Sequence, residues 1–222
     1  MQDYVFHFGP VFARWEDLLW GLARTLELSV TSMAFGLLIG ILGAVGRSFG
    51  PKPVAWAVTA YVELIRNTPL LIQLYFIYFT LPFLGLRLSS NTAAIVALSI
   101  HLGAYATEIV RAGLGSIPKG QIEAGKTLGL STYRIVRHIV FVPAIRAVYP
   151  AITSQFILQL LGSSIVSAIA AEELTAIANN MVMQSFRTFE IYIVVAVIYF
   201  IVVQAFIVVF RFGGNVLFRW KT

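Results

Sequence analysis

The 222-residue chain contains no cysteine, so disulfide bonds and thiolate chemistry are excluded. Its three histidines lie far apart in the sequence and form no cluster with the spacing of metal ligands: His7, His101 and His138. Charged residues make up only 12% of the chain. A nucleophile paired with a base is also not apparent, so the sequence gives no support for a membrane enzyme.

Apolar side chains, by contrast, make up 59% of the sequence, and its mean hydropathy is +0.84. A soluble domain of this size cannot bury that much apolar surface, so we expect lipid to be the solvent. The net charge is +6, with the basic residues at the edges of apolar runs. We interpret these charges as determinants of membrane topology rather than of nucleic-acid binding.

Five segments are long and apolar enough to cross a membrane, which takes about 20 residues as a helix. We predict an all-α membrane protein with spans at residues 18–46, 53–81, 90–112, 144–171 and 189–211. Glycine and proline punctuate the loops between them. No internal repeat is evident, so we expect a single membrane domain over residues 1–222.

The charges of the loops predict the orientation of this domain. Basic residues gather in the first loop, the third loop and the C-terminal tail: Arg47, Lys52, Lys119, Lys126, Arg134, Arg137, Arg219 and Lys221. The positive-inside rule places these regions, including the loop at 113–143, in the cytoplasm. With five spans, the N-terminus is then expected outside, and no cleaved signal peptide is evident.

Small residues recur in the first span at Gly36, Gly40 and Ala44. Such residues let two helices approach closely in lipid. They could form a subunit interface or pack within one subunit, and we favour packing within the subunit. In the third span we expect Glu108 to pair with Arg111, and His101 to be a packed or hydrogen-bonded histidine.

The second span is too long for one straight helix, because residues 53–81 would extend about 42 Å across a hydrocarbon core of about 30 Å. It also contains Asn67-Thr68-Pro69. Thr68 can cap a helix and Pro69 suits a first helical position, so we predict a break with a new helix beginning there. A helix N-terminus inside the bundle would suit a substrate carboxylate, with Asn67 and Thr68 in the substrate pathway. A purely structural kink is the alternative.

A polar-to-small stripe runs along the fourth span at every fourth position, through Gln155, Gln159, Ser163, Ser167 and Ala171. In lipid this stripe must face protein or water. It could line a substrate pathway or supply hydrogen bonds between helices, and we slightly favour the pathway.

Residues 116–131 form a short polar segment between two spans. Pro118 suits the first turn of a helix, and Gly129 is a plausible stop with left-handed backbone freedom. The helix is too short and too polar to span a membrane, so we expect it to lie along the cytoplasmic surface. From these residues alone it could simply anchor a loop.

The same segment resembles the EAA loop of bacterial ABC importer permeases, whose pattern is Glu-Ala-Ala, three residues, Gly, nine residues and Ile-x-Leu-Pro. Glu123 and Ala124 match, and Gly129 and Ile139 keep their spacing. Three positions depart from the pattern: Gly125 for the second alanine, Phe141 for leucine, and Pro143 one residue late. The stretches 61–71, 104–111 and 189–190 are similar to the polar amino acid uptake branch of that family.

The resemblance implies a type I ABC importer permease with a cytoplasmic coupling helix. It implies a second permease subunit, identical or homologous, a dimer of ATPase subunits that carries ATP and Mg²⁺, and an extracytoplasmic substrate-binding protein for an amino acid. ATPase docking falls to Glu123, Ala124, Gly125 and Gly129. The chain has no Gly-x-x-x-x-Gly-Lys-[Ser/Thr] motif, so we expect it to be no enzyme and to hold no cofactor. The alternative is an ion-driven secondary transporter or channel, for which no coupling-ion site or repeat is evident.

Overall fold

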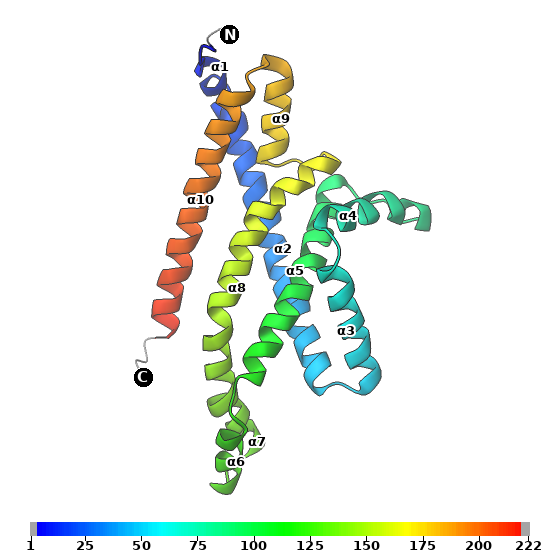
Figure 1. Cartoon of the computed structure of the whole chain (residues 1–222), viewed down its shortest axis with the longest axis vertical. Coiled ribbons are helices and arrows are strands. Elements are labelled where there is room, and N and C mark those ends of the chain that lie inside the picture. The colour runs from blue at the N-terminus through cyan, green and yellow to red at the C-terminus, as the bar shows by residue number, and fades with distance from the viewer. Residues whose placement is uncertain (1–3, 219–222) are drawn as a thin grey trace. The chain divides into compact units, whose positions relative to one another are not determined.

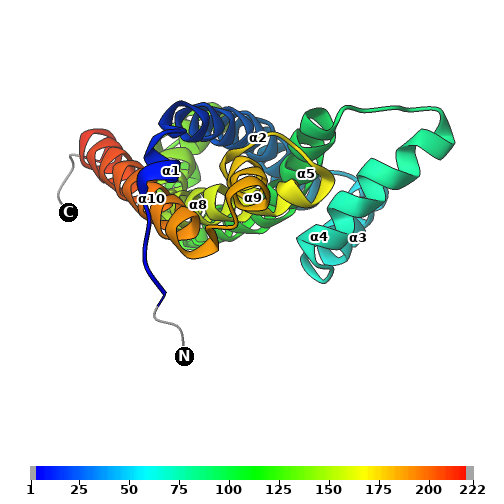
Figure 2. The same cartoon turned by 90° about the horizontal axis from the view of Figure 1, so that it is seen from above.

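The computed structural model describes residues 4–218, which form helices and connecting loops without a strand in that range (Figure 1; Figure 2). The longest helices are α2 (Trp15–Phe49), α5 (Ser90–Gly115), α8 (Val142–Gly162) and α10 (Thr188–Leu217). Shorter helices are α1 (Gly9–Phe12), α3 (Lys52–Arg66), α4 (Leu70–Tyr75), α6 (Lys119–Thr127), α7 (Thr132–Arg134) and α9 (Leu174–Ser185). The π-helical segments are η1 (Phe76–Thr80) and η3 (Ile135–Phe141), and the 3-10 segments are η2 (Leu81–Leu84) and η4 (Ser163–Ile169).

Four helical segments are long and apolar enough to cross a membrane: 15–49, 90–115, 132–169 and 188–217. The helices Lys52–Arg66 and Leu70–Leu84 pass the same criterion together as one interrupted span. Four of the five predicted spans are therefore confirmed, and the predicted second span corresponds to this pair of helices, which is bent by 110°. The predicted tail residues Arg219 and Lys221 lie outside the described residues.

The boundaries of the fourth span are a correction, because its helical segment begins at Thr132 instead of residue 144. The third span likewise continues to Gly115, so most of the predicted 113–143 loop is helical. Hydropathy detects only the part of a helix that is apolar, whereas the added turns carry Arg134 and Arg137. A helix can extend past the hydrocarbon where its side chains are charged.

The chain divides into two compact units, the first comprising residues 1–33, 69–98 and 157–208. One of its apolar cores joins the first turns of α2 and α10 to α9 through Leu18, Leu174, Met181 and Ile191. In Figure 1, α9 accordingly lies beside the beginning of α10. A second core gathers around Leu28, Leu74, Leu98 and Val166.

The second unit comprises residues 34–68, 99–156 and 209–222. Here α2 packs closely on α5: a Cβ added to Gly36 would lie 2.7 Å from Leu102 Cβ. A Cβ added to Gly40 would lie 3.0 Å from the carbonyl carbon of Ala106. The small residues of the first span thus serve packing within the subunit, as predicted. The Tyr61 hydroxyl also donates to the Ile100 carbonyl at 2.6 Å, which ties α3 to α5.

Candidate functional site: the α6 helix, the interrupted span and the polar stripe

The α6 helix ends in a backbone turn that requires glycine. Gly129 has φ +73°, in the left-handed region that side chains with a Cβ rarely adopt. Its N–H donates to the Lys126 carbonyl at 2.9 Å, and the Leu130 N–H donates to the Gly125 carbonyl at 3.1 Å. These two bonds form a Schellman motif and confirm the predicted stop. The start is one residue later than predicted, because Pro118 has extended backbone (φ −60°, ψ 129°) and precedes the helix.

The predicted docking residues fall on two sides of α6. Glu123 and Ala124 are exposed, whereas Gly125 is buried. A Cβ at Gly125 would lie 2.7 Å from Ile139 Cδ1 and 3.2 Å from Ile135 Cγ1, both on η3. Glycine in place of the second alanine therefore lets α6 lie directly on η3. The docking role itself stays a prediction.

Phe141 and Pro143, which depart from the EAA loop pattern, lie in the helical segment that follows α6. Ser131 caps α7, because its Oγ accepts the Arg134 N–H at 3.4 Å. The chain then passes from the π-helical η3, which ends at Phe141, into α8, which carries Pro143, without a break in helical structure.

The second span is interrupted where predicted. The side chains of Asn67 and Thr68, however, bond to the preceding helix α3 instead of capping the following helix α4. Thr68 Oγ1 donates to the Leu64 carbonyl at 2.8 Å, and Asn67 Nδ2 donates to the Glu63 carbonyl at 2.8 Å. Both side chains thus donate to carbonyls in the last turn of α3, where the Glu63 carbonyl also accepts the backbone N–H of Asn67 at 3.2 Å. The N-cap of α4 is Pro69, which makes no side-chain cap, so the predicted capping by Thr68 is wrong.

The polar stripe is divided between buried and half-buried positions. Gln159 and Ser163 are buried in the first unit. Gln159 Nε2 donates to the Leu98 carbonyl at 2.9 Å and to Ser32 Oγ at 3.2 Å, which joins α8 to α5 and α2. Gln155 and Ser167 are half-buried.

The regular spacing of the stripe does not continue to its end. Helix α8 ends at Gly162, and residues Ser163–Ile169 form the 3-10 segment η4. A 3-10 helix has about 3.0 residues per turn, so positions four apart no longer share one face. Ser163 and Ser167 instead donate to the local carbonyls of Leu160 and Ser164, at 2.7 and 2.8 Å.

A charged cluster joins the C-terminal parts of α2 and α5. Arg111 donates to Glu108 Oε2 at 2.9 Å, which confirms the predicted pair. Arg47 of α2 also contacts Glu108, a partner that was not predicted. Arg47 and Glu108 are 61 residues apart, so no local pattern could have shown the pairing.

A second missed residue is Glu173, which is fully buried at the N-cap of α9. Its carboxylate accepts the N–H groups of Ala176 and Thr175, at 2.7 and 2.8 Å, and the Tyr199 hydroxyl at 3.0 Å. Burial raises the pKa of Glu173, and these donors offset part of that rise. The sequence feature that could have indicated this role is an acidic residue directly before an apolar helix. A carboxylate at that position can accept hydrogen bonds from the unpaired N–H groups of the first helical turn.

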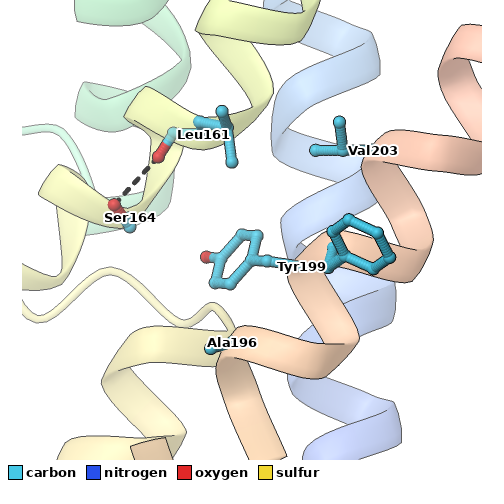
Figure 3. Close-up of a pocket in the computed structure, with 6 residues that line it drawn as sticks. Leu161, Ser164, Ala196, Tyr199 and Val203 are labelled. Atoms are coloured by element: carbon cyan, nitrogen blue, oxygen red, sulfur yellow. Dashed lines mark hydrogen bonds between the residues drawn. The ribbon is translucent and has the colours of Figure 1, made fainter. Parts of the chain in front are cut away.

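An apolar surface pocket lies between the α8–η4 segment and α10 (Figure 3), and its volume is about 430 Å³. Leu161, Ser164, Ala196, Tyr199, Phe200 and Val203 line it. Its polar groups are already used, because Ser164 donates to the Leu161 carbonyl at 2.9 Å and Tyr199 donates to Glu173. None of the predicted pathway residues lines this cavity. Within residues 4–218 there is also no group of acidic or histidine side chains that could hold a metal ion.

Comparison with known proteins identifies the family. Residues 36–219 match the family described as "Binding-protein-dependent transport system inner membrane component". The glutamine transport system permease protein GlnP of Escherichia coli strain K12 is 38% identical over 187 residues, which cover 83% of this chain and 85% of GlnP. The L-cystine transport system permease protein TcyB of Bacillus subtilis strain 168 is 34% identical over 189 residues, 85% of this chain and 81% of TcyB.

Solved structures agree with this assignment. The crystal structure of an amino acid ABC transporter matches with a TM-score of 0.89 and 33% identity, covering 96% of this chain and 99% of that chain. An inward-facing structure of the MetNI methionine ABC transporter matches with a TM-score of 0.74 and 25% identity, covering 92% and 98%. The chain therefore belongs to the family of inner membrane components of binding-protein-dependent transport systems, and it is a permease subunit of an ABC importer.

Proposed function

We propose that this permease subunit carries an amino acid across the bacterial inner membrane by alternating access. A second permease subunit, identical or homologous, completes the pathway, and an extracytoplasmic binding protein delivers the substrate. A separate pair of ATPase subunits holds ATP and Mg²⁺. The support is the substrate class in the names of the similar proteins: glutamine for GlnP, cystine for TcyB, and an amino acid for the transporter with TM-score 0.89.

The helix α6 is the proposed point of contact with the ATPase. Its form and packing are the main structural support for the proposed coupling to ATP hydrolysis. It is short, and its start and end are fixed by Pro118 and Gly129. It presents Glu123 and Ala124 to solvent while Gly125 is buried against η3. Such a helix can bind a groove on one side and remain attached to the membrane helices on the other.

The proposed topology places the N-terminus outside, and the α6 region and C-terminus in the cytoplasm. Its support is the basic composition around α6, where Lys119, Lys126 and Arg134 lie in or near the connecting helices. Cytoplasmic loops carry such an excess of Lys and Arg. The whole chain then acts as one transmembrane domain.

The substrate pathway is proposed to include Asn67, Thr68, Gln155, Gln159, Ser163 and Ser167. In support, α4 begins without a side-chain cap, so its first N–H groups receive no side-chain cap hydrogen bond that would compete with a carboxylate. Because Asn67 and Thr68 bond to α3 carbonyls, they would shape this break rather than cap it. Gln159 would act by holding α8 against its neighbours.

Reconstitution tests the proposed function as a whole. The tagged chain, purified with its ATPase and placed in proteoliposomes, should take up an amino acid only when ATP and the binding protein are supplied. An imposed Na⁺ or proton gradient without ATP should produce no uptake. Uptake driven by the ion gradient alone would favour the secondary transporter instead.

The carboxylate hypothesis needs its own comparison. Competition by the amino acid should exceed competition by its α-carboxyl amide when each is loaded inside the vesicles and therefore bypasses the binding protein. Equal competition by the two compounds would mean that the break is only a structural kink.

A further inference from the structure

A row of aromatic rings covers the N-terminal segment Tyr4–Trp15. Neighbouring ring centroids are 5.2 to 6.5 Å apart along the series Tyr4, Phe6, Phe8, Phe12 and Trp15. Tyr4 also meets Phe189 of α10 edge to face at 5.3 Å. Phe6 is 54% exposed and Phe12 is 58% exposed. Residues 4–13 include no Asp, Glu, Lys or Arg, and the next residue, Arg14, pairs with Asp17 at 2.6 Å.

The segment is fixed to the first unit rather than loosely attached. Glu190 is fully buried in the first turn of α10. Its carboxylate accepts the backbone N–H of His7 at 2.9 Å and also accepts a hydrogen bond from the Tyr4 hydroxyl. Val11 of α1 is 1% exposed in the core that also contains Leu18 and Ile191. In Figure 2, α1 lies against α10 in agreement with these contacts. The outward direction of the rings is therefore a property of the folded segment.

The adjoining spans also expose apolar side chains. Leu19 and Val30 of α2 are exposed, as are Val197 and Phe200 of α10. These side chains lie on membrane-crossing helices, where lipid is the natural contact. Tyr and Trp rings gather at the level of the lipid headgroups, because one part of each ring system is apolar and another part can hydrogen bond.

We propose that Tyr4–Trp15 is an interfacial anchor that lies in the headgroup region of the leaflet at the N-terminal end of α2, with membrane phospholipid as its partner. Lipid explains why residues 4–13, which include no Asp, Glu, Lys or Arg, expose several aromatic rings, whereas water alone would disfavour that exposure. An anchor of this kind enters the boundary between headgroups and acyl chains by about 5–10 Å. The proposal does not depend on which side of the membrane this leaflet faces.

Depth-dependent fluorescence quenching tests the proposal in the full chain. Because the chain has no cysteine, Phe6→Cys and Phe12→Cys can each be labelled singly with a small fluorophore. The labelled protein is reconstituted in phosphatidylcholine vesicles with nitroxide either near the headgroup or deep on the acyl chain. Labels at positions 6 and 12 should be quenched more strongly by the shallow nitroxide than by the deep one.

Two matched positions calibrate the result. A label at Val197→Cys on α10 should be quenched more by the deep nitroxide and confirms correct insertion. A label at Glu123→Cys on α6 should respond to aqueous iodide and to neither lipid quencher. If positions 6 and 12 behave like position 123, the anchor is excluded, and the rings are instead available to a protein partner. Quenching mainly by the deep nitroxide would also contradict an interfacial location.

Discussion

The side-chain amide of Gln159 donates to Ser32 Oγ at 3.2 Å and so joins α8 to α2 inside the first unit. The same nitrogen donates to the Leu98 carbonyl on α5 at 2.9 Å. One buried side chain thus connects three membrane helices. Gln159 is 3% exposed, so the loss of its hydrogen bonds should be measurable.

Gln159→Leu should therefore lower the stability of the permease. The substitution removes two buried hydrogen bonds between helices, each of which contributes about 0.5–1.5 kcal/mol. We expect a lower midpoint in a thermal unfolding assay in detergent. The matched control is Gln155→Leu, at a half-buried position of the same stripe, which should change the midpoint much less. Equal effects of the two substitutions would contradict a special role for the three-helix connection.

Gly40→Leu should separate α2 from α5. Even a Cβ at position 40 would lie 3.1 Å from Ala106 Cα, so a larger side chain must push the helices apart. Overpacking of this kind costs about 1–3 kcal/mol. The yield of folded protein after size-exclusion chromatography should fall. Gly120→Ala is the control, because a Cβ at position 120 meets nothing within 4 Å, and it should leave the yield unchanged.

Gly129→Val should impair coupling while the membrane helices remain folded. Valine at φ +73° is strained, and a left-handed residue costs about 1–2 kcal/mol without glycine. The end of α6 would rearrange, and stimulation of ATP hydrolysis in the reconstituted complex should fall. Gly115→Ala, where a Cβ meets nothing within 4 Å, should retain stimulation.

Glu123→Arg tests the surface of α6 independently of its backbone. Glu123 is exposed, so the substitution should not affect folding. We expect reduced co-purification of the ATPase, with a smaller loss for Glu123→Gln, which keeps the size of the side chain. Unchanged co-purification and uptake in the arginine variant would indicate that α6 only anchors its loop.

Glu173 should make stability depend on pH. Burial raises its pKa in the folded state, so the folded protein binds this proton more tightly than the unfolded chain does. The resulting stabilisation is complete below the ordinary Glu pKa of about 4.3 and is lost as pH rises through the folded-state value. The thermal midpoint of Glu173→Gln should therefore vary less with pH than that of the native chain. Glu172→Gln, at an exposed neighbour, should retain the native pH dependence.

The features that could be predicted from sequence are those fixed by nearby residues. Long apolar runs gave the five spans, and the glycine at position 129 gave the end of α6, because backbone strain is a local property. Glu108 and Arg111, one turn apart, were also paired correctly. Each of these depends on residues within a few turns of one another.

The features that escaped prediction depend on competition or on distant partners. The Thr68 hydroxyl could accept an N–H of the following helix or donate to a carbonyl of the preceding one. The local sequence allows both, and only the folded backbone determines which of them forms. Arg47 meets Glu108 through tertiary packing, and Glu173 is buried by helices far away in the sequence. The four-residue spacing of the polar stripe assumed a continuous α-helix, which the 3-10 segment at Ser163 ends.

The close packing of α6 on η3 should affect how the two elements move relative to each other. Because Gly125 lacks a side chain, Ile135 and Ile139 fill the space beside the α6 backbone, with no soft layer between the two elements. Close-packed side chains transmit displacement instead of absorbing it. If α6 is displaced, as the proposed contact with the ATPase requires, η3 should move with it, and η3 continues directly into α8. The absence of a side chain at Gly125 would thus make the proposed connection between the ATPase and the membrane helices rigid.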